Sequence, residues 1–458
     1  MLLVAAIFFW PGIPMYDTVS QYDQVLGNDV TDWHPPIVVR LWQLLHPLAN
    51  GTAPMFALQV GLYALGAGLV VAVLVRAARH WAATVAVVVF FSPLLLGWQM
   101  VVLKDTQMQA ALIAAFGLLA WFRLVGRKVP LWLAAAAGVL LLYATLARAN
   151  AVFVTAPLGI LLIQRHPKLG VSILGSAATI AVVLGLSPLV NHRLFGATDS
   201  GVARSQALFD LAAIAVNTPP GTPSLFSPPE RRQLVERHCV KAFFWDPLGD
   251  PSACGPITDR LGEVPEQDLY IGLARAVTAH PIAYAEHRVM HWNSTERWLV
   301  SPNLTDAGPP DEAEPNDLGL QSPRSPVMPA WQSVASVEAA TPLGWPIVWT
   351  VLGLILLWPA WRRQSEPAGS LAIALLASAL TLEASFLVIS IASDVRYHLW
   401  PMLAVPLAAI LLADRRLRTG PVGGASLLIL VVAVGIFSRA TLPRAPDNYQ
   451  AMIHWAYG

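Results

Sequence analysis

A few ionisable residues stand at the borders of long apolar segments, and they are the first candidates for chemistry in this sequence. Asp17 directly follows the first apolar segment, and Lys104 and Asp105 begin another in VVLKDTQMQAALIAAF. Arg148 and Asn150 lie between two further segments in LARANAVFVTAPLG. Polar groups at the depth of a membrane are costly, so such residues indicate a functional site by default.

A second polar group begins a late apolar segment, SDVRYHLWPMLAVPLAA, and consists of Asp394, Arg396, Tyr397 and His398. Glu383 lies within the preceding segment. Several of these candidates also have a purely structural interpretation. Asp105 could cap the N-terminus of a helix, Arg148 could extend its side chain to the membrane surface, and Arg396 could simply pair with Asp394.

The stretch YDTVSQYDQVLGNDVTDWHPPIVVRLW places further acids near Asp17. Asp23 and Asp29 have the surroundings of a solvated loop, whereas Asp17, Asp32 and His34 could hold a divalent cation through oxygen and imidazole ligands. The sequence contains no HExxH, paired CxxC, Walker or GxGxxG motif. It therefore predicts no certain cofactor, and a divalent metal at Asp17, Asp32 and His34 is kept as the alternative.

The composition predicts the elements that must position these residues. The chain has 458 residues, of which 55% are hydrophobic and 12% charged, and its mean hydropathy is +0.55. Soluble domains carry about 25% charged residues. We predict an all-α polytopic membrane protein with about 11 transmembrane helices. They are expected near residues 1–13, 53–75, 81–98, 106–122, 131–147, 151–163, 170–190, 344–361, 368–392, 397–413 and 421–437.

The distribution of basic residues predicts the orientation of these helices. Alternate connections carry the basic residues Arg76, Arg79, Arg123, Arg127, Lys128, Arg165, Lys168, Arg362, Arg363, Arg415, Arg416 and Arg418. The positive-inside rule makes those connections cytoplasmic. We therefore predict a multi-pass protein of the inner (plasma) membrane whose acidic candidates face the extracytoplasmic side.

This orientation divides the chain into parts. We predict an N-terminal transmembrane module over 1–190, with about seven helices and an outer loop at 14–52. An extracytoplasmic domain of mixed or irregular structure follows at 191–343, then about four helices over 344–437 and an outer tail at 438–458. Cys239 and Cys254 are expected to form a disulfide outside the cytoplasm. The net charge of +1 and the lack of a basic block predict no nucleic-acid partner, and the apolar segments predict contact with membrane lipids.

Four stretches, in this order, resemble motifs of the GT-C superfamily of integral membrane glycosyltransferases. They are DWHPPIVVRLW, KDTQMQA, ARANAVFVTAPLG and RYHLWPMLAVPLAAILL. The likeness is to the branch of protein mannosyltransferases and lipid A aminoarabinose transferases. The sequence departs from that branch at Thr18, where many relatives carry a second acid, and at His34, where they carry a lysine before the proline pair.

The resemblance implies a GT-C-like fold and a glycosyltransferase that uses a polyprenyl-phosphate-linked sugar donor and a lipid, glycan or protein acceptor. Asp17 is expected to be the general base, with Asp105 next. The residues expected to bind the lipid phosphate and the substrate are His34, Lys104, Arg148, Asn150, Arg396 and Tyr397. A single displacement would invert the anomeric centre, and the amphipathic segment 34–48 would cover the lipid's path.

Two other classes of protein remain as alternatives. A glycan polymerase or ligase of the O-antigen type also has outer arginines that hold lipid phosphates, but it usually places its large loop late in the chain. A lipid or glycan transporter would show internal repeats and charged residues deep within its helices. The one-sided gathering of ionisable residues favours the glycosyltransferase.

Overall fold

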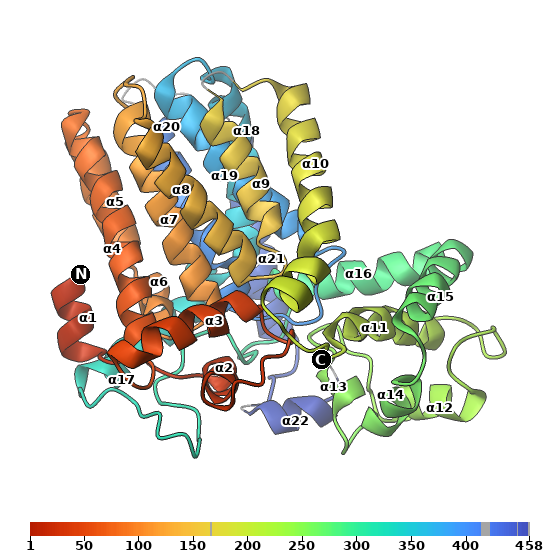
Figure 1. Ribbon diagram of the computed structural model, residues 1–458. Coiled ribbons are helices and arrows are strands. Elements are labelled where there is room, and N and C mark those ends of the chain that lie inside the picture. Colours follow the sequence, from red (N-terminus) through yellow and green to blue (C-terminus); the bar gives the residue numbers. More distant parts are fainter. Residues whose placement is uncertain (165–166, 414–421, 447, 457–458) are drawn as a thin grey trace.

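The regular structure of the chain is helical. The computed structural model describes residues 1–458 except 165–166, 414–421, 447 and 457–458. Within these described residues no β-strand forms, and only isolated bridges such as Ile13–Val101 pair extended backbone. Figure 1 shows two layers: a bundle of long helices, and beneath it a layer of shorter helices and loops.

The bundle is formed by α4 (Ala53–Arg76), α5 (His80–Phe90), α6 (Pro93–Gln99), α7 (Lys104–Arg123), α8 (Leu131–Ala147), α9 (Val152–Ile163), α10 (Leu169–Pro188), α18 (Pro346–Arg362), α19 (Pro367–Ser385), α20 (Leu399–Leu412) and α21 (Val422–Thr441). Glycines let α4 and α7 touch at the backbone. A Cβ atom added at Gly66 would lie 2.5 Å from the carbonyl carbon of Ile113, and one at Gly117 would lie 2.9 Å from Gly66 O. Such close approach is typical of helix pairs in membranes.

Fewer helices are long enough to span a bilayer than the sequence predicted. Among the residues that the structure describes, five helical stretches are long and apolar enough, namely 53–76, 169–194, 367–385, 395–412 and 423–441. The number is six if the pair α5 and α6, bent by 56°, counts as one. The apolar helices α8, α9 and α18 are shorter, and α1 (Leu2–Phe8) has only 7 residues. The chain is thus a multi-pass membrane protein, but the prediction of about 11 spans is not confirmed.

The predicted basic connections meet at one end of the bundle. Arg79 donates to Leu411 O at 2.9 Å, Arg123 to Gln164 O at 2.8 Å, and Arg363 to Leu412 O at 2.8 Å. These carbonyls lie at helix C-termini, where cations are favourable. We call this the arginine end; Arg165, Arg415, Arg416 and Arg418 lie outside the described residues.

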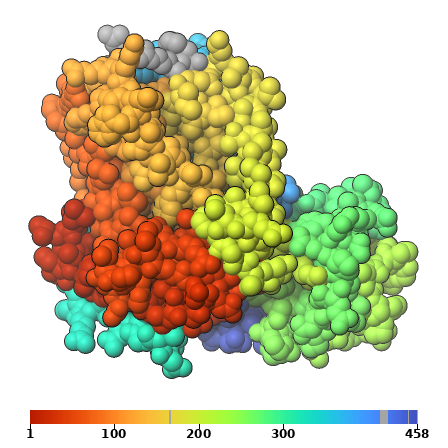
Figure 2. Space-filling model, in the orientation of Figure 1, coloured from red at the N-terminus to blue at the C-terminus, as the bar shows by residue number. Residues whose placement is uncertain are grey.

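The opposite end of the bundle is covered by the N-terminal helices. Helix α2 (Tyr16–Gly27) and helix α3 (Pro36–Leu45) cross beneath it. Figure 2 shows this part of the chain, in red, beside the yellow and green surface of later residues. Trp42 of α3 is buried, whereas Leu44 of the same helix and Leu48, which follows it, are 73% and 78% exposed. An apolar outer face of this kind suits a helix that lies in the membrane interface.

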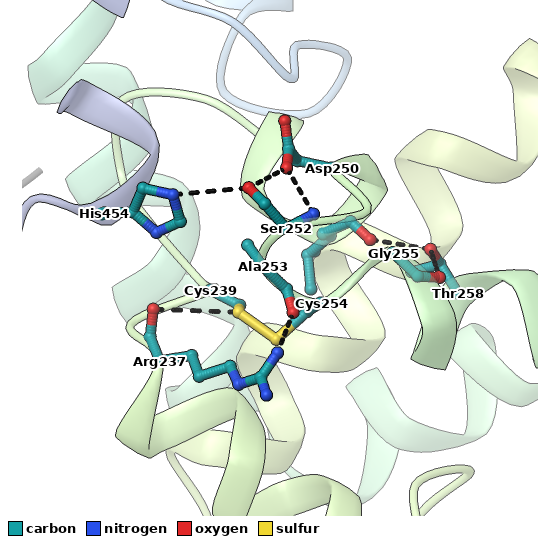
Figure 3. The surroundings of a disulfide bond; sticks show 10 residues. Arg237, Cys239, Asp250, Ser252, Ala253, Cys254, Gly255, Thr258 and His454 are labelled. Carbon is teal, nitrogen blue, oxygen red and sulfur yellow. Dashed lines mark hydrogen bonds between the residues drawn. A yellow bond between two sulfur atoms is a disulfide. The ribbon is translucent and has the colours of Figure 1, made fainter. Parts of the chain in front are cut away.

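Residues 191–343, which we call the middle segment, contain seven α-helices: α11 (Val202–Val216), α12 (Pro228–Glu236), α13 (Asp246–Gly249), α14 (Gly255–Leu261), α15 (Glu266–Ala279), α16 (Pro281–Thr295) and α17 (Val327–Ala340). The described structure here is helical with long loops, where the sequence predicted mixed or irregular structure. Cys239 and Cys254 are bonded as a disulfide beside α14 (Figure 3). The chain's last helix, α22 (Tyr449–His454), buries Met452 and Ile453 in the same core.

Candidate active site

The end of the bundle opposite the arginine end gathers most of the predicted site residues. Asp17 lies in the first turn of α2, and Lys104 and Asp105 in the first turn of α7. Arg148 follows α8, and Arg396 belongs to a short helix, η4 (Val395–His398). The first turn of a helix favours carboxylates because its N–H groups are unpaired and its dipole is positive there.

Thr18 explains how α2 is fixed against the start of α7. Its hydroxyl donates to Val102 O at 2.5 Å and accepts from the backbone N–H of Met15 at 2.9 Å. The hydroxyl therefore joins two segments that are far apart in sequence. Thr18 stands where many proteins of the family that the sequence resembles carry an acid. In this chain its hydroxyl links α2 to the segment before α7.

Asp17 lies between two cations. It forms an ion pair with Lys104, and its Oδ2 is 3.3 Å from a guanidinium nitrogen of Arg396. Burial raises the pKa of Asp17, but Arg396 and Lys104 outweigh that effect and hold the pKa well below its ordinary value. Arg396 also contacts Asp394 at 2.9 Å. The carboxylate is thus charged, and its basicity is low while both cations contact it.

A second ion pair joins Asp105 and Arg148, and both side chains are buried. The other carboxylate oxygen of Asp105, Oδ2, is buried without a hydrogen-bond partner. Arg148 lies over the ring of Tyr397, with its guanidinium carbon 4.0 Å from the ring centroid. The guanidinium carbon of Arg396 is 5.4 Å from the same centroid. The two arginines therefore share one aromatic ring as a common support.

His34 completes the cluster as a neutral side chain. Burial and the nearby Lys104 lower its pKa to about 3. Its Nδ1 is 3.0 Å from Lys104 Nζ, so Nδ1 accepts from the ammonium group and the proton of the neutral ring is on Nε2. Nε2 is buried without a partner. It is an unused donor beside the cations.

Two predicted residues lie apart from these contacts. Asn150 is buried close to Arg148 in sequence, and its Oδ1 has no hydrogen-bond partner. Asp32 accepts from the backbone and hydroxyl of Ser200 and lies 3.5 Å from His192. Across the described residues, no group of three or more His, Cys, Asp or Glu side chains is placed to hold a metal ion. The structure therefore does not bring Asp32 together with Asp17 and His34.

Sequence reasoning missed the part of the middle segment that contacts η4. His398 Nδ1 lies 2.7 Å from Glu383 Oε2, and its Nε2 lies 3.0 Å from the hydroxyl of Thr295. The neighbouring Glu296 accepts from Thr350 at 3.0 and 3.1 Å. Burial and the nearby Glu383 raise the pKa of Glu296 well above its ordinary value. Thr295 and Glu296 lie in a polar stretch, HWNSTERW, where neither residue carries a signal of its own.

Comparison with known proteins adds one similarity in structure. No family model and no curated protein matches the chain. The structure is similar to that of the archaeal oligosaccharyltransferase AglB from Archaeoglobus fulgidus, solved in complex with an inhibitory peptide and a dolichol-phosphate. The two share 13% identity with a TM-score of 0.35, over 96% of this chain and 54% of that chain. The chain thus spans about half the length of that protein, and a likeness of this degree carries no functional inference.

Proposed function

We propose that this chain is a membrane glycosyltransferase that moves a sugar from a polyprenyl-phosphate donor to an acceptor hydroxyl. One observation carries the proposal: Lys104, Arg148 and Arg396 converge at one buried end of the bundle, each paired with a carboxylate. Buried charges in an apolar protein are costly and are retained mainly for function. The order of motifs that resembles the GT-C superfamily supports the same reaction class.

The cations suit a lipid phosphate as their ligand. A guanidinium can bind two phosphate oxygens at once, and the shared ring of Tyr397 holds Arg148 and Arg396 near each other. Lys104 and the Nε2–H of His34 supply further donors. In the structure, carboxylates neutralise these cations. An incoming phosphate would therefore replace the carboxylates as the partner of Arg396 and Lys104.

This exchange assigns a role to Asp17. When a phosphate takes over Arg396 and Lys104, the two cations no longer lower the pKa of Asp17, and the carboxylate becomes a better base. The acceptor oxygen attacks the anomeric carbon, the bond from that carbon to the phosphate oxygen breaks, and the phosphate leaves with the electron pair. The acceptor proton passes to Asp17. A single displacement inverts the anomeric centre, and Lys104, Arg148 and Arg396 stabilise the leaving phosphate.

The geometry of the bundle supports a particular orientation. The arginine end carries the basic connections and is assigned to the cytoplasm by the positive-inside rule. The cation cluster then faces the extracytoplasmic side, together with the middle segment. Helix α3, with its exposed Leu44, lies in the interface and borders the path of the lipid.

The test compares two aspartates of the same helix. Asp17→Asn keeps the size of the side chain but removes the base, whereas Asp23 is exposed and makes no contact with the cluster. In nanodiscs supplied with polyprenyl phosphate sugars, Asp17→Asn should lower sugar transfer about 10²-fold or more. It should still bind bare polyprenyl phosphate. Asp23→Asn should match the wild type.

Three results would count against the proposal. Full transfer by Asp17→Asn would remove Asp17 as the base, and Asp105→Asn would then be the next variant to test. A wild-type protein that binds no polyprenyl phosphate would remove the donor class itself. Transport of the lipid without cleavage of the sugar–phosphate bond would favour the transporter alternative.

A further inference from the structure

The loop that carries Arg396 and Tyr397 runs from the end of α19 to the start of α20, and the middle segment holds its backbone. Three contacts fix its first part. Arg288 donates to Ser390 O at 2.7 Å, the N–H of Trp245 donates to Ile391 O at 2.9 Å, and Phe244 pairs with Ala392 in an isolated bridge. All three partners come from residues 191–343.

The same pattern continues to η4. Arg297 donates to Ser393 O at 2.9 Å, and the hydroxyl of Ser393 lies 3.1 Å from that of Ser294. The N–H of Val395 donates to Asp306 O at 3.0 Å. Arg297 is itself buried and also donates to the carbonyl oxygens of residues 304 and 305. The middle segment thus encloses the residues of the loop that directly precede Arg396.

His398 directly follows Arg396 and Tyr397 in sequence and is also held by the middle segment. Its ring is fully buried, with Phe386 4.8 Å away between ring centroids. Both ring nitrogens are satisfied when Nδ1–H donates to Glu383 and Nε2 accepts from the hydroxyl of Thr295. One contact comes from helix α19 of the bundle and the other from the last residue of α16. His398 therefore joins the middle segment to the bundle at the position where η4 ends.

We propose that the middle segment positions Arg396 and Tyr397, with Thr295 and His398 as positioning residues. The physical reason is that a guanidinium on a mobile loop binds a phosphate more weakly, because the loop must lose conformational entropy when the phosphate binds. The functional part of this inference rests on the proposed phosphate site. Its structural part, the ordering of residues 390–398 by the middle segment, does not.

The chain offers a matched control in the same buried region. Thr350 donates to Glu296, the neighbour of Thr295, and makes no contact with η4 among the described hydrogen bonds. Thr295→Val and Thr350→Val remove the same hydroxyl from buried threonines. Only the first leaves a nitrogen of His398 unpaired. Thr295→Ser keeps the hydroxyl and should restore wild-type behaviour.

The experiment uses the full chain in nanodiscs and two readouts. Hydrogen–deuterium exchange of peptides covering 390–398 should be about tenfold faster in Thr295→Val, and the Kd for bare polyprenyl phosphate should rise about five- to tenfold, as for the loss of one buried hydrogen bond. Thr350→Val and Thr295→Ser should resemble the wild type in both readouts.

Unchanged exchange in Thr295→Val, or equal changes in Thr295→Val and Thr350→Val, would overturn the inference. The inference would likewise fail if exchange became faster while the Kd stayed at its wild-type value. If the wild type itself binds no polyprenyl phosphate, the proposed function fails. The exchange measurements then still decide whether the middle segment orders the loop.

Discussion

The ion pair between Asp105 and Arg148 allows its structural and functional roles to be separated. Asp105 has a side-chain exposure of 0% and Arg148 of 9%. Arg148→Met keeps most of the apolar length of the side chain but leaves the carboxylate buried without a counter-charge. Removal of one partner of a buried pair costs about 3–5 kcal/mol. Because Asp105 Oδ2 already lacks a partner, we expect a loss within that range.

The double variant Arg148→Met/Asp105→Asn removes both charges. It should regain most of the lost stability, to within about 1 kcal/mol of the wild type, because no unpaired charge remains. Its affinity for polyprenyl phosphate should stay low. The loss of one charged hydrogen-bond donor corresponds to about 2 kcal/mol, or about thirtyfold in Kd. Stability and binding should thus respond differently to the second substitution.

Thermal unfolding in detergent, followed by the fluorescence of the 17 tryptophans, measures the stability of each variant. Lipid titration in nanodiscs measures its affinity for polyprenyl phosphate. A double variant that binds polyprenyl phosphate as tightly as the wild type would show that Arg148 is a structural residue and not a phosphate ligand. A single variant as stable as the wild type would show that Asp105 does not need its partner.

The remaining predictions concern the middle segment, the tail and the orientation. Replacing Cys239 and Cys254 with alanine should lower the free energy of unfolding by about 2–4 kcal/mol under non-reducing conditions; an unchanged midpoint of unfolding would contradict a stabilising bridge. Burial raises the pKa of Asp246 to about 6, in spite of a hydrogen bond from Tyr449. Because this folded-state pKa lies above the ordinary value of 3.8, the folded protein binds the extra proton between about pH 4 and 6, and stability falls as pH rises through that window. Asp246→Asn should therefore raise the Tm relative to the wild type at pH 8 but not at pH 4, and a difference independent of pH would refute this. A reporter fused near residue 260 should be extracytoplasmic and one near residue 126 cytoplasmic; the reverse result would move the cation cluster to the cytoplasmic side.

Sequence reasoning singled out most members of the charged cluster because charge is rare in this chain. Asp17, Lys104, Arg148 and Arg396 stand out in apolar surroundings, where an unpaired charge is costly. The local pair of Arg396 with Asp394 was anticipated, whereas the pairing of Asp17 with both Lys104 and Arg396 could not be deduced, since it depends on how α2, α7 and η4 meet. Thr295 gave no signal because a hydroxyl in a polar segment is ordinary.

The span count shows a second limit of sequence reasoning. An apolar run predicts a helix but not the residues at which that helix begins and ends, so hydropathy alone does not fix whether the helix is long enough to cross a bilayer. Helices α8 and α18, with 17 residues each, and α9, with 12, are apolar but shorter than the helices that are long enough to span. The tail at 438–458 was predicted as an outer part of the chain, and the packing of its helix α22 into the core of the middle segment could not be deduced from the sequence.

A structure of the full chain with bound polyprenyl phosphate would show whether the cluster of Lys104, Arg148 and Arg396 is the donor site. We expect the phosphate within hydrogen-bonding distance of Lys104, Arg148 and Arg396, with Asp17 released from Arg396 and facing the phosphate's free side. A phosphate bound elsewhere, with the pairs of Asp17 and Asp105 intact, would contradict the assignment of this cluster as the donor site.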